Sequence, residues 1–216
     1  MKHITFYFDV ISPYAYLAFQ QLPHALRGIS CNVTYRPVLL AGVLAHYGQL
    51  CPAEIAPKRE WTYRHVQWLA NSANIPLQMP LGHPFSPLAL LRLALAAQPL
   101  LCGEVNRFVC ESIFKHVWCS GLEAYDAQRF DALVQQLRPA CNFQSIDVKN
   151  SLKVNTALAI SQGVFGVPSF AVANKMFRGL DALPMLRSCL LGDEWFAGSA
   201  WQAASQVSVG ACRNRL

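Results

Sequence analysis

The segment Phe6–Leu17, FYFDVISPYAYL, restricts the fold of this chain more than any other part of the sequence. Aromatic and β-branched residues run from Ile4 to Ile11, which is the composition of a buried strand rather than a helix. Ser12 and Pro13 then form a helix start, because a serine oxygen accepts from the free amides of a first turn and a proline lacks an N–H that would stay unpaired there. A strand therefore runs directly into a helix N-terminus, with one hydroxyl at the junction.

This junction has a chemical implication. A helix N-terminus carries a partial positive charge of about half a unit, which favours an anion such as a thiolate. Taken alone, Ser12 with Pro13 is most simply a helix cap. Whether the hydroxyl also takes part in chemistry depends on which residues the remainder of the chain brings near it.

The residues that follow predict a βαβ unit. A helix is expected from Pro13 to about Ala25, and a strand from Cys31 to Pro37 or slightly beyond. Strand, helix and strand within about forty residues match the span of a right-handed βαβ unit. Residues 39–57 carry Gly and Pro at irregular spacing, and we expect a short helical turn followed by a loop.

The middle of the chain predicts a helical block of about ninety residues. Ser86 and Pro87 repeat the cap signal before Leu88–Gln98, which is apolar on nearly every side and should be central to a subdomain. Asp126 is expected to cap the last helix of the block and Pro139 to end it. The predicted helices cover residues 57–73, 88–98, 103–119 and 126–138, with a proline-rich loop over 76–84.

The last part predicts a helix, a hairpin and a further helix. The first helix covers 146–162, the hairpin runs from Val164 to Arg178 with Asn174-Lys175 as its turn, and the last helix covers 181–191. Residues 199–216 are expected to form a loosely attached tail. This order is that of an α/β thioredoxin-like fold with an inserted all-α subdomain, divided into residues 1–48 with 146–216 and residues 49–145.

Composition narrows the class of protein. The chain has 216 residues, 53% of them hydrophobic and 14% charged, and a net charge of +6 without any basic run of five. We expect an attraction for small anions, no nucleic acid partner and no membrane span, since no apolar run reaches roughly 18 residues. The eight cysteines form no Cys-x-x-Cys and no signal peptide opens the chain, so we expect free thiols in the cytoplasm. His46, His65 and His83 lack metal-ligand spacing, and no metal is predicted.

Six segments between residues 3 and 191 carry a resemblance to a known family. They are Phe8–Leu17, Arg36–Leu40, Pro57–Arg59, His83–Phe85, Gly163–Phe170 and Met176–Asp181. In this order they resemble the 2-hydroxychromene-2-carboxylate isomerases and kappa-class glutathione transferases, relatives of the disulfide-forming thioredoxin-like proteins. The resemblance implies an enzyme that uses glutathione as a cofactor on a small aromatic carboxylate in aromatic-hydrocarbon breakdown, and a homodimer.

The resemblance also implies where the thiol would bind. Ser12 stands where the oxidoreductase relatives carry the first cysteine of a redox pair, so the sulfur is brought by glutathione and stabilised by the serine hydroxyl and the helix amides. Without cysteine at Ser12 or Ala15, direct dithiol exchange is excluded at this site. Val167-Pro168 matches the family's cis-proline, which leaves the Val167 backbone open to pair with the cysteinyl backbone of glutathione. The alternative is an ordinary trans proline at a strand start.

Four more residues match the family's glutathione contacts. Asp181 would hold the γ-glutamyl ammonium, with the Leu180 amide available for the adjoining carboxylate; the alternative is a plain N-cap, and both roles can coexist. Lys58 would face the glycyl carboxylate, or else be a solvated lysine in a first helical turn. Gln49 lies near a position where relatives often use asparagine.

The second substrate is less defined by the sequence. Tyr14, Arg64 and Arg178 are the candidates to position an acid, while Arg178 could also be an edge-strand arginine that limits aggregation. The chain departs from the isomerases at four positions, which concern the second substrate more than glutathione: Ser86, Arg178, Leu180 and Ala182. The leading function is a glutathione-dependent isomerase of a 2-hydroxychromene-2-carboxylate-like acid. The alternatives are a kappa-class-like transferase that consumes glutathione and a thioredoxin-like binding or chaperone module.

Overall fold

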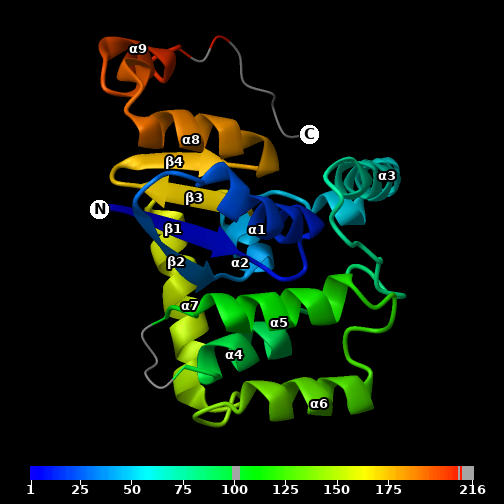
Figure 1. The fold of residues 1–216 in the computed structure, drawn as a ribbon. Helices are drawn as coiled ribbons and strands as arrows, with labels where there is room; N and C mark the ends of the chain where they lie inside the picture. Colours follow the sequence, from blue (N-terminus) through cyan, green and yellow to red (C-terminus); the bar gives the residue numbers. More distant parts are fainter. Residues whose placement is uncertain (99–102, 209, 211–216) are drawn as a thin grey trace.

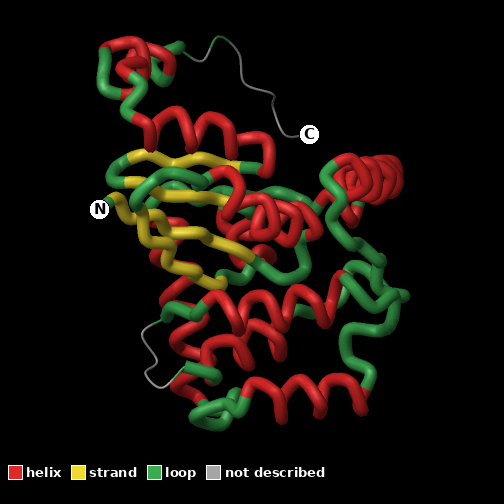
Figure 2. The backbone as a smooth tube through the Cα atoms, viewed as in Figure 1, coloured by secondary structure: helices red, strands yellow, loops and turns green. Residues whose placement is uncertain are grey.

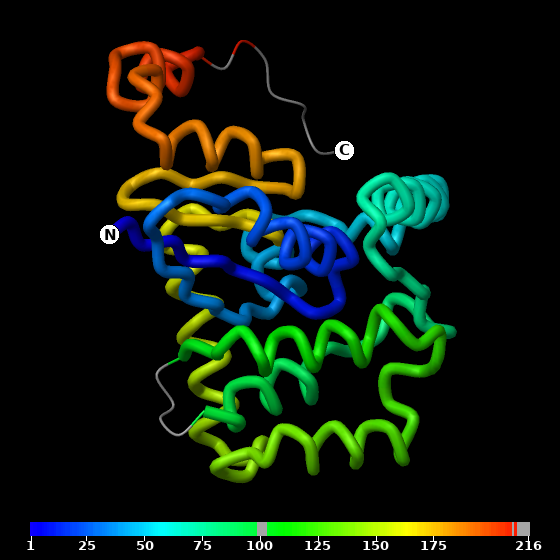
Figure 3. The backbone as a smooth tube through the Cα atoms, in the orientation of Figure 1, coloured from blue at the N-terminus to red at the C-terminus, as the bar shows by residue number. Residues whose placement is uncertain are grey.

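A computed structural model of the chain describes residues 1–98, 103–208 and 210. Its centre is a mixed four-stranded sheet with the strand order β2-β1-β3-β4 (Figure 1). Strand β1 pairs in parallel with β2 and antiparallel with β3, and β3 pairs antiparallel with β4. The strands are β1 (Lys2–Phe8), β2 (Cys31–Pro37), β3 (Ser169–Val172) and β4 (Lys175–Arg178). Figure 3 shows that β1 and β3 lie side by side although about 160 residues separate them.

Strand β1 divides the core between its two faces. Ile4, Phe6 and Phe8 are buried together with the apolar side of α1, while Tyr7 on the other face is buried with Ala159 of α7. Alternate side chains of a strand point to opposite faces, so the apolar run of β1 supports a layer on each side. Helix α1 (Pro13–Ala25) also packs against α8 (Leu183–Leu191), and α7 (Ile146–Ser161) packs against β2 and α2 (Leu40–His46).

The inserted helices continue the same core. Helix α4 (Leu88–Ala96), predicted to be central because it is apolar all round, packs against α5 (Arg107–Trp118) and α7. The ring of Phe114 on α5 lies 5.4 Å from the ring of Phe8, which joins the helices to the sheet. Helix α6 (Ala127–Leu137) covers α5, with Asp126 as its cap as predicted. Because one core crosses the expected boundary, the division into residues 1–48 with 146–216 and 49–145 stays a prediction.

Helix α3 (Ala56–Ser72) is placed differently from the other inserted helices. In Figure 2 it stands beside α1, away from the stack of α4, α5 and α6. It packs against α1 and the 3-10 turn η1 (Pro52–Glu54). No helix within the described residues is both long and apolar enough to cross a membrane.

The structure departs from the predicted element bounds at three places. Helix α5 begins at Arg107 because the Asn106 side chain accepts from the N–H of Val109 at 2.9 Å. The predicted cap at Ser86 is wrong, since Pro87 takes the N-cap position of α4 without a side-chain bond. The hairpin turn lies one residue earlier than expected, at Ala173 and Asn174, which both have positive φ.

The predicted loose tail is wrong for its first part. Residues Ser199–Ala204 form α9, after the turns η2 (Leu180–Ala182) and η3 (Glu194–Phe196). The ring of Trp201 lies 5.3 Å from that of Phe196 and 6.1 Å from that of Phe177, so α9 is attached to the sheet by aromatic packing. The end of the tail, residues 209 and 211–216, lies outside the described residues. All six cysteines for which the structure gives a state are free, as predicted.

Asn155 of α7 connects three parts of the fold. Its side chain is 1% exposed, and its Nδ2 donates to the carbonyl of Pro37 at 2.9 Å and to that of Gly103 at 2.6 Å. Gly103 has φ +77°, and a Cβ at this position would collide with the Asn155 side chain. One amide therefore satisfies buried carbonyls at the end of β2 and ahead of α5.

We expect Asn155→Ala to lower the free energy of unfolding by about 2–4 kcal/mol, because two buried carbonyls lose their donor. Chemical denaturation followed by circular dichroism measures this loss. The control is Asn150→Ala, which changes an exposed asparagine of the same helix and should stay within about 0.5 kcal/mol of the wild type. Equal losses in the two variants would contradict the assignment.

Candidate functional site

Ser12 lies at the junction of β1 and α1, as the sequence predicts. Its Oγ accepts from the N–H of Ala15 at 3.2 Å, and the side chain is 7% exposed. Within the described part of the chain its O–H has no acceptor, so the proton is free to be donated to a ligand. The hydroxyl caps the helix and also faces a cavity of about 510 Å³.

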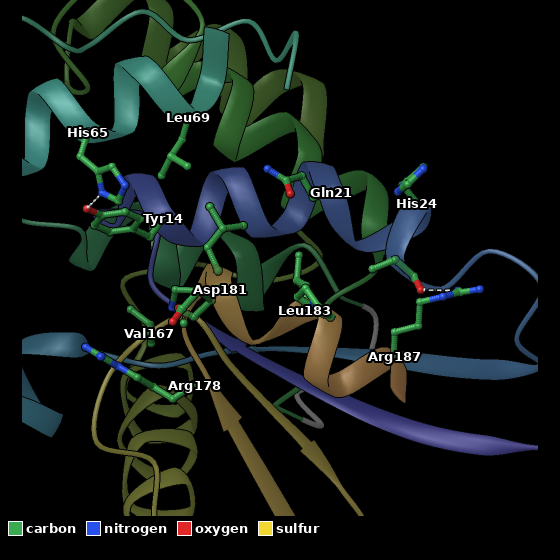
Figure 4. A pocket seen from close by; sticks show the side chains of 15 residues that line it. Tyr14, Gln21, His24, His65, Leu69, Val167, Arg178, Asp181, Leu183 and Arg187 are labelled. Carbon is green, nitrogen blue, oxygen red and sulfur yellow. Dashed lines mark hydrogen bonds between the residues drawn. The ribbon is translucent and has the colours of Figure 1, made fainter. Parts of the chain in front are cut away.

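Two neighbouring cavities form one groove beside Ser12. The cavity at Ser12 is also lined by Gln49 and Lys58. A second cavity of about 830 Å³ is lined by Pro168, Leu180 and Asp181 and is drawn in Figure 4. Three residues line both, namely Tyr14, Val167 and Arg178. The structure thus brings together every predicted site residue except one.

The exception is Arg64. Its side chain is 76% exposed, lies 3.7 Å from Glu60 of the same helix, and lines neither cavity. Successive turns of α3 instead present Lys58, Thr62 and His65 to the groove, which leaves Arg64 on the solvent side. The expectation that Arg64 positions the substrate is therefore not supported by the geometry.

The wall opposite α1 is formed by Val167 and Pro168. Their peptide bond is cis, as predicted, and a second cis bond at His83-Pro84 was not indicated by the sequence. The carbonyl of Pro168 accepts from Gly179 at 2.9 Å, whereas neither the N–H nor the C=O of Val167 has a partner in residues 1–98 and 103–208. A free donor and acceptor on one residue can pair with the backbone of an extended peptide.

The charged residues of the groove have no counterions of their own. No ion pair within 4.0 Å involves Lys58, Arg178 or Asp181 in the described residues. Asp181 makes no capping hydrogen bond either, which removes the N-cap alternative, and its carboxylate lies so close to Gly179 that a Cβ there would collide with it. Because Gly179 also has φ +104°, glycine is needed at this position.

Tyr14 and His65 form a polar pair at the mouth between the two cavities. The Tyr14 hydroxyl and His65 Nδ1 are 2.9 Å apart (Figure 4). Burial raises the pKa of Tyr14, a nearby Thr62 bond opposes this, and the charge of Asp181 adds to the rise. Tyr14 therefore stays a neutral phenol, which can donate or accept a hydrogen bond in the groove.

His83 holds the loop that precedes Ser12, a role that the sequence did not reveal. Its Nε2 donates to the carbonyl of Ile11 at 2.9 Å, and its Nδ1 lies 2.7 Å from the Tyr63 hydroxyl. Burial lowers the pKa of His83, although the bond to Ile11 opposes the effect. A neutral ring with both nitrogens engaged is suited to fix the loop rather than to transfer protons.

Asp9 is the second residue that the sequence reading missed. It is completely buried, and its carboxylate accepts from the N–H of Ile11 at 3.1 Å and of Leu40 at 2.8 Å. Its own carbonyl accepts from the N–H of Ser12 at 3.1 Å. The available signal was a single acidic residue inside an apolar strand, which requires buried donors. Asp9 thereby joins the ends of β1 and the start of α2 around the catalytic candidate.

The pKa of Asp9 is raised to about 7 by burial, against the opposing effect of its backbone hydrogen bonds. The folded state thus holds this proton more tightly than the unfolded state, so the stability it contributes is greatest below about pH 4 and is lost as pH rises through about 7. Asp9→Asn should remove this dependence. Between about pH 4 and pH 8 its unfolding free energy should gain about 4 kcal/mol relative to wild type.

Denaturant titrations of both proteins across this pH range measure the effect. At low pH the variant should be the less stable protein, because an amide replaces one acceptor by a donor facing a backbone N–H. A difference between the two proteins that stays constant with pH would contradict the titration assigned to Asp9.

The chemistry of the groove is that of an anion and peptide site. No cluster of three His, Cys, Asp or Glu side chains that could hold a metal occurs among the described residues. The cavity at Ser12 has a largely apolar lining, and its polar side chains include the Thr62 hydroxyl, the Gln49 amide and the Lys58 ammonium, which can donate to an anion. The unpaired N–H and C=O of Val167 add a donor and an acceptor for a peptide backbone, and the unpaired carboxylate of Asp181 adds a partner for a cation.

Comparison with known proteins gives a family and a set of relatives. The family model described as DSBA-like thioredoxin domain matches residues 3–191. A protein named 2-hydroxychromene-2-carboxylate isomerase from Sphingobium xenophagum is 27% identical over 197 residues, covering 88% of this chain and 98% of that protein. Glutathione S-transferase kappa 1 from Rattus norvegicus is 23% identical over 212 residues, covering 89% and 92%. Both names agree with the resemblance predicted from the sequence.

Solved structures agree on the fold. The structure of a 2-hydroxychromene-2-carboxylate isomerase has a TM-score of 0.75 at 23% identity, covering 95% of this chain and all of that chain. The cytosolic disulfide reductase DsbM from Pseudomonas aeruginosa with GSH has a TM-score of 0.57 at 16% identity, covering 94% and 99%. The predicted α/β thioredoxin-like fold with helices inserted after the βαβ unit is confirmed.

Proposed function

Because the chain belongs to the family of DSBA-like thioredoxin domains, we propose that it is a glutathione-dependent enzyme whose catalytic thiolate is held at Ser12. The observation that carries the proposal is the free Ser12 hydroxyl at the start of α1, facing the open Val167 backbone across one groove. A protein with cysteine at this junction would supply its own thiol. A serine instead offers a donor to a sulfur that arrives with a ligand.

The residues of the groove fit glutathione along its length. The Val167 N–H and C=O would pair with the cysteinyl backbone beside the cis-Pro168, in the manner of a short added strand. Asp181 would take the γ-glutamyl ammonium, and the Leu180 amide the carboxylate next to it. Lys58, with Gln49 nearby, would take the glycyl carboxylate in the cavity at Ser12.

Ser12 and the N-terminus of α1 would set the ionisation of the bound sulfur. A hydroxyl donor and the positive end of a helix both favour the thiolate over the thiol, which lowers the thiol pKa. Bound in this groove, glutathione would supply a nucleophilic thiolate for reversible addition to an unsaturated carbon, and it would be regenerated in each cycle. His83 and Asp9 would keep Ser12 in place during these steps by holding the loop before it.

The reaction we propose is the isomerisation of a 2-hydroxychromene-2-carboxylate-like aromatic acid. Ring opening and rotation about a carbon–carbon bond need only temporary loss of a double bond, which reversible thiolate addition allows. Tyr14 would hydrogen-bond an oxygen of this acid, and Arg178 would attract its carboxylate. On the family resemblance alone, we also propose a homodimer that works in the cytoplasm.

A kappa-class-like transferase is the alternative supported by the relatives, and stoichiometry separates the two reactions. The expected result with 2-hydroxychromene-2-carboxylate is conversion to the equilibrium mixture of the two isomers by a small, undiminished amount of glutathione. Substrate absorbance and a thiol assay on the same sample measure both quantities. Consumption of one glutathione per product would support the transferase, and no binding of glutathione in calorimetry would support the binding module and overturn the proposed enzyme.

Ser12→Ala should raise the pKa of the bound glutathione thiol and lower turnover by roughly ten- to a hundredfold, because one hydrogen bond to the thiolate is lost. Ultraviolet absorbance of the thiolate during a pH titration reports the first effect, and initial rates report the second.

The matched control is Ser145→Ala. Ser145 caps α7 in the same way, with its Oγ accepting from Val148 at 3.4 Å, but it lies outside both cavities. This control should lose about 1 kcal/mol of stability without any change in thiol pKa. If Ser12→Ala behaves like Ser145→Ala, Ser12 is a cap and nothing more.

A further inference from the structure

Among the described residues, Arg178 is the one charged side chain that lines both cavities of the groove. It stands at the end of β4, and Figure 4 shows its side chain on the Val167 side of the groove, across from Tyr14 and His65. Its guanidinium carbon lies 5.4 Å from the centre of the Phe165 ring, so a cation–π contact holds it on one side.

Gly166 holds the guanidinium on another side. A Cβ built on Gly166 would lie 3.2 Å from Nε and 3.4 Å from one terminal nitrogen of Arg178, so the group packs directly on this backbone. A larger residue would push the guanidinium out of its position. The arginine is therefore fixed between a ring and a glycine, which reduces the entropy lost when it binds a ligand.

The guanidinium is fixed without an anion. Within the described residues no carboxylate lies within 4.0 Å of Arg178 and no acceptor receives a hydrogen bond from it. Arg36, by contrast, contacts Glu104 at 2.8 Å. A role limited to protecting the edge strand β4 would not require a guanidinium packed toward a cavity.

We propose that Phe165 and Arg178 form a clamp for the second substrate, a planar aromatic carboxylate. The guanidinium binds the carboxylate through two parallel N–H donors, and the exposed ring of Phe165, 42% accessible, stacks against the aromatic part of the same molecule. Both side chains line the cavity that contains Ser12, which brings the acid to the thiolate. The inference rests on the proposed function and adds the residues of this chain that would select its aromatic acid.

Glutathione itself carries two carboxylates, and the groove offers separate donors for them. Lys58 lies on α3, on the other wall of the Ser12 cavity, and the Leu180 amide lies beside Asp181. A planar guanidinium also matches a carboxylate conjugated to a ring better than an ammonium does, because its donors lie in one plane. The clamp therefore predicts that Arg178 distinguishes aromatic acids from their neutral analogues. Lys58 is expected to contribute to the binding of glutathione and not of the acid.

The test uses two probes of the same shape, coumarin-3-carboxylate and coumarin, which lacks the carboxylate. Calorimetry measures their affinity for the protein alone and for the protein saturated with glutathione. Wild type should bind the acid about ten- to a hundredfold more tightly than coumarin. Arg178→Gln should abolish this preference and leave glutathione affinity within about twofold of wild type, and Phe165→Leu should weaken both probes equally, by about three- to tenfold.

Lys175→Gln is the matched control, since it removes a cation from the same strand outside both cavities. It should bind both probes and glutathione as wild type does. Lys58→Gln should lower the affinity for glutathione and leave the affinity for both probes unchanged.

Two results would overturn the clamp: an unchanged preference for the acid in Arg178→Gln, or a large loss of glutathione affinity in that variant with the acid unaffected. Failure of the proposed function has a different signature. In that case glutathione does not bind to wild type, while the probes added to the protein alone still show whether Arg178 selects a carboxylate.

Discussion

The site depends on how β1 ends. The side chain of Asp9 accepts from the amides of Ile11 and Leu40 directly after β1 ends at Phe8, and these bonds shape the turn that leads into α1. Removing a charge from water is costly, so this arrangement persists only because backbone donors surround it. Its result is a helix N-terminus with Ser12 exposed to a cavity, instead of a helix end covered by the core.

The second half of the site comes from sheet topology. The order β2-β1-β3-β4 places the hairpin next to β1, so the entry to β3 faces the end of β1. Val167 is therefore carried to Ser12 by strand pairing, although about 155 residues lie between them. The inserted helices supply the third wall, because α3 returns to pack on α1 and presents Lys58 to the same cavity. Strand pairing fixes the walls that carry Ser12 and Val167, while side-chain packing fixes the wall formed by α3.

Most of the fold was predictable because strong local signals agree with the long-range order. The bounds of α1 and β2 follow from Ser12-Pro13 and from alternation, and the cis bond at Pro168 follows from the family motif. Features set by tertiary contacts were not predictable, such as the aromatic packing of Trp201 that attaches α9. Arg64 was misjudged for the same reason, since a helix shows its period in sequence but not which of its faces will meet a groove.

The charges of the groove explain how one site could serve two ligands. Polar groups in a protein core usually form hydrogen bonds within the fold, because an unpaired buried group is destabilising. Asn155 and Asp9 do so here. Lys58, Arg178 and Asp181 are left unpaired at the rim, where water screens them and the cost is small. Their signs differ and they stand on three different elements, α3, β4 and η2. In the proposed function, glutathione would use Lys58 and Asp181 and the acid would use Arg178, so the two ligands would not compete for the same charge.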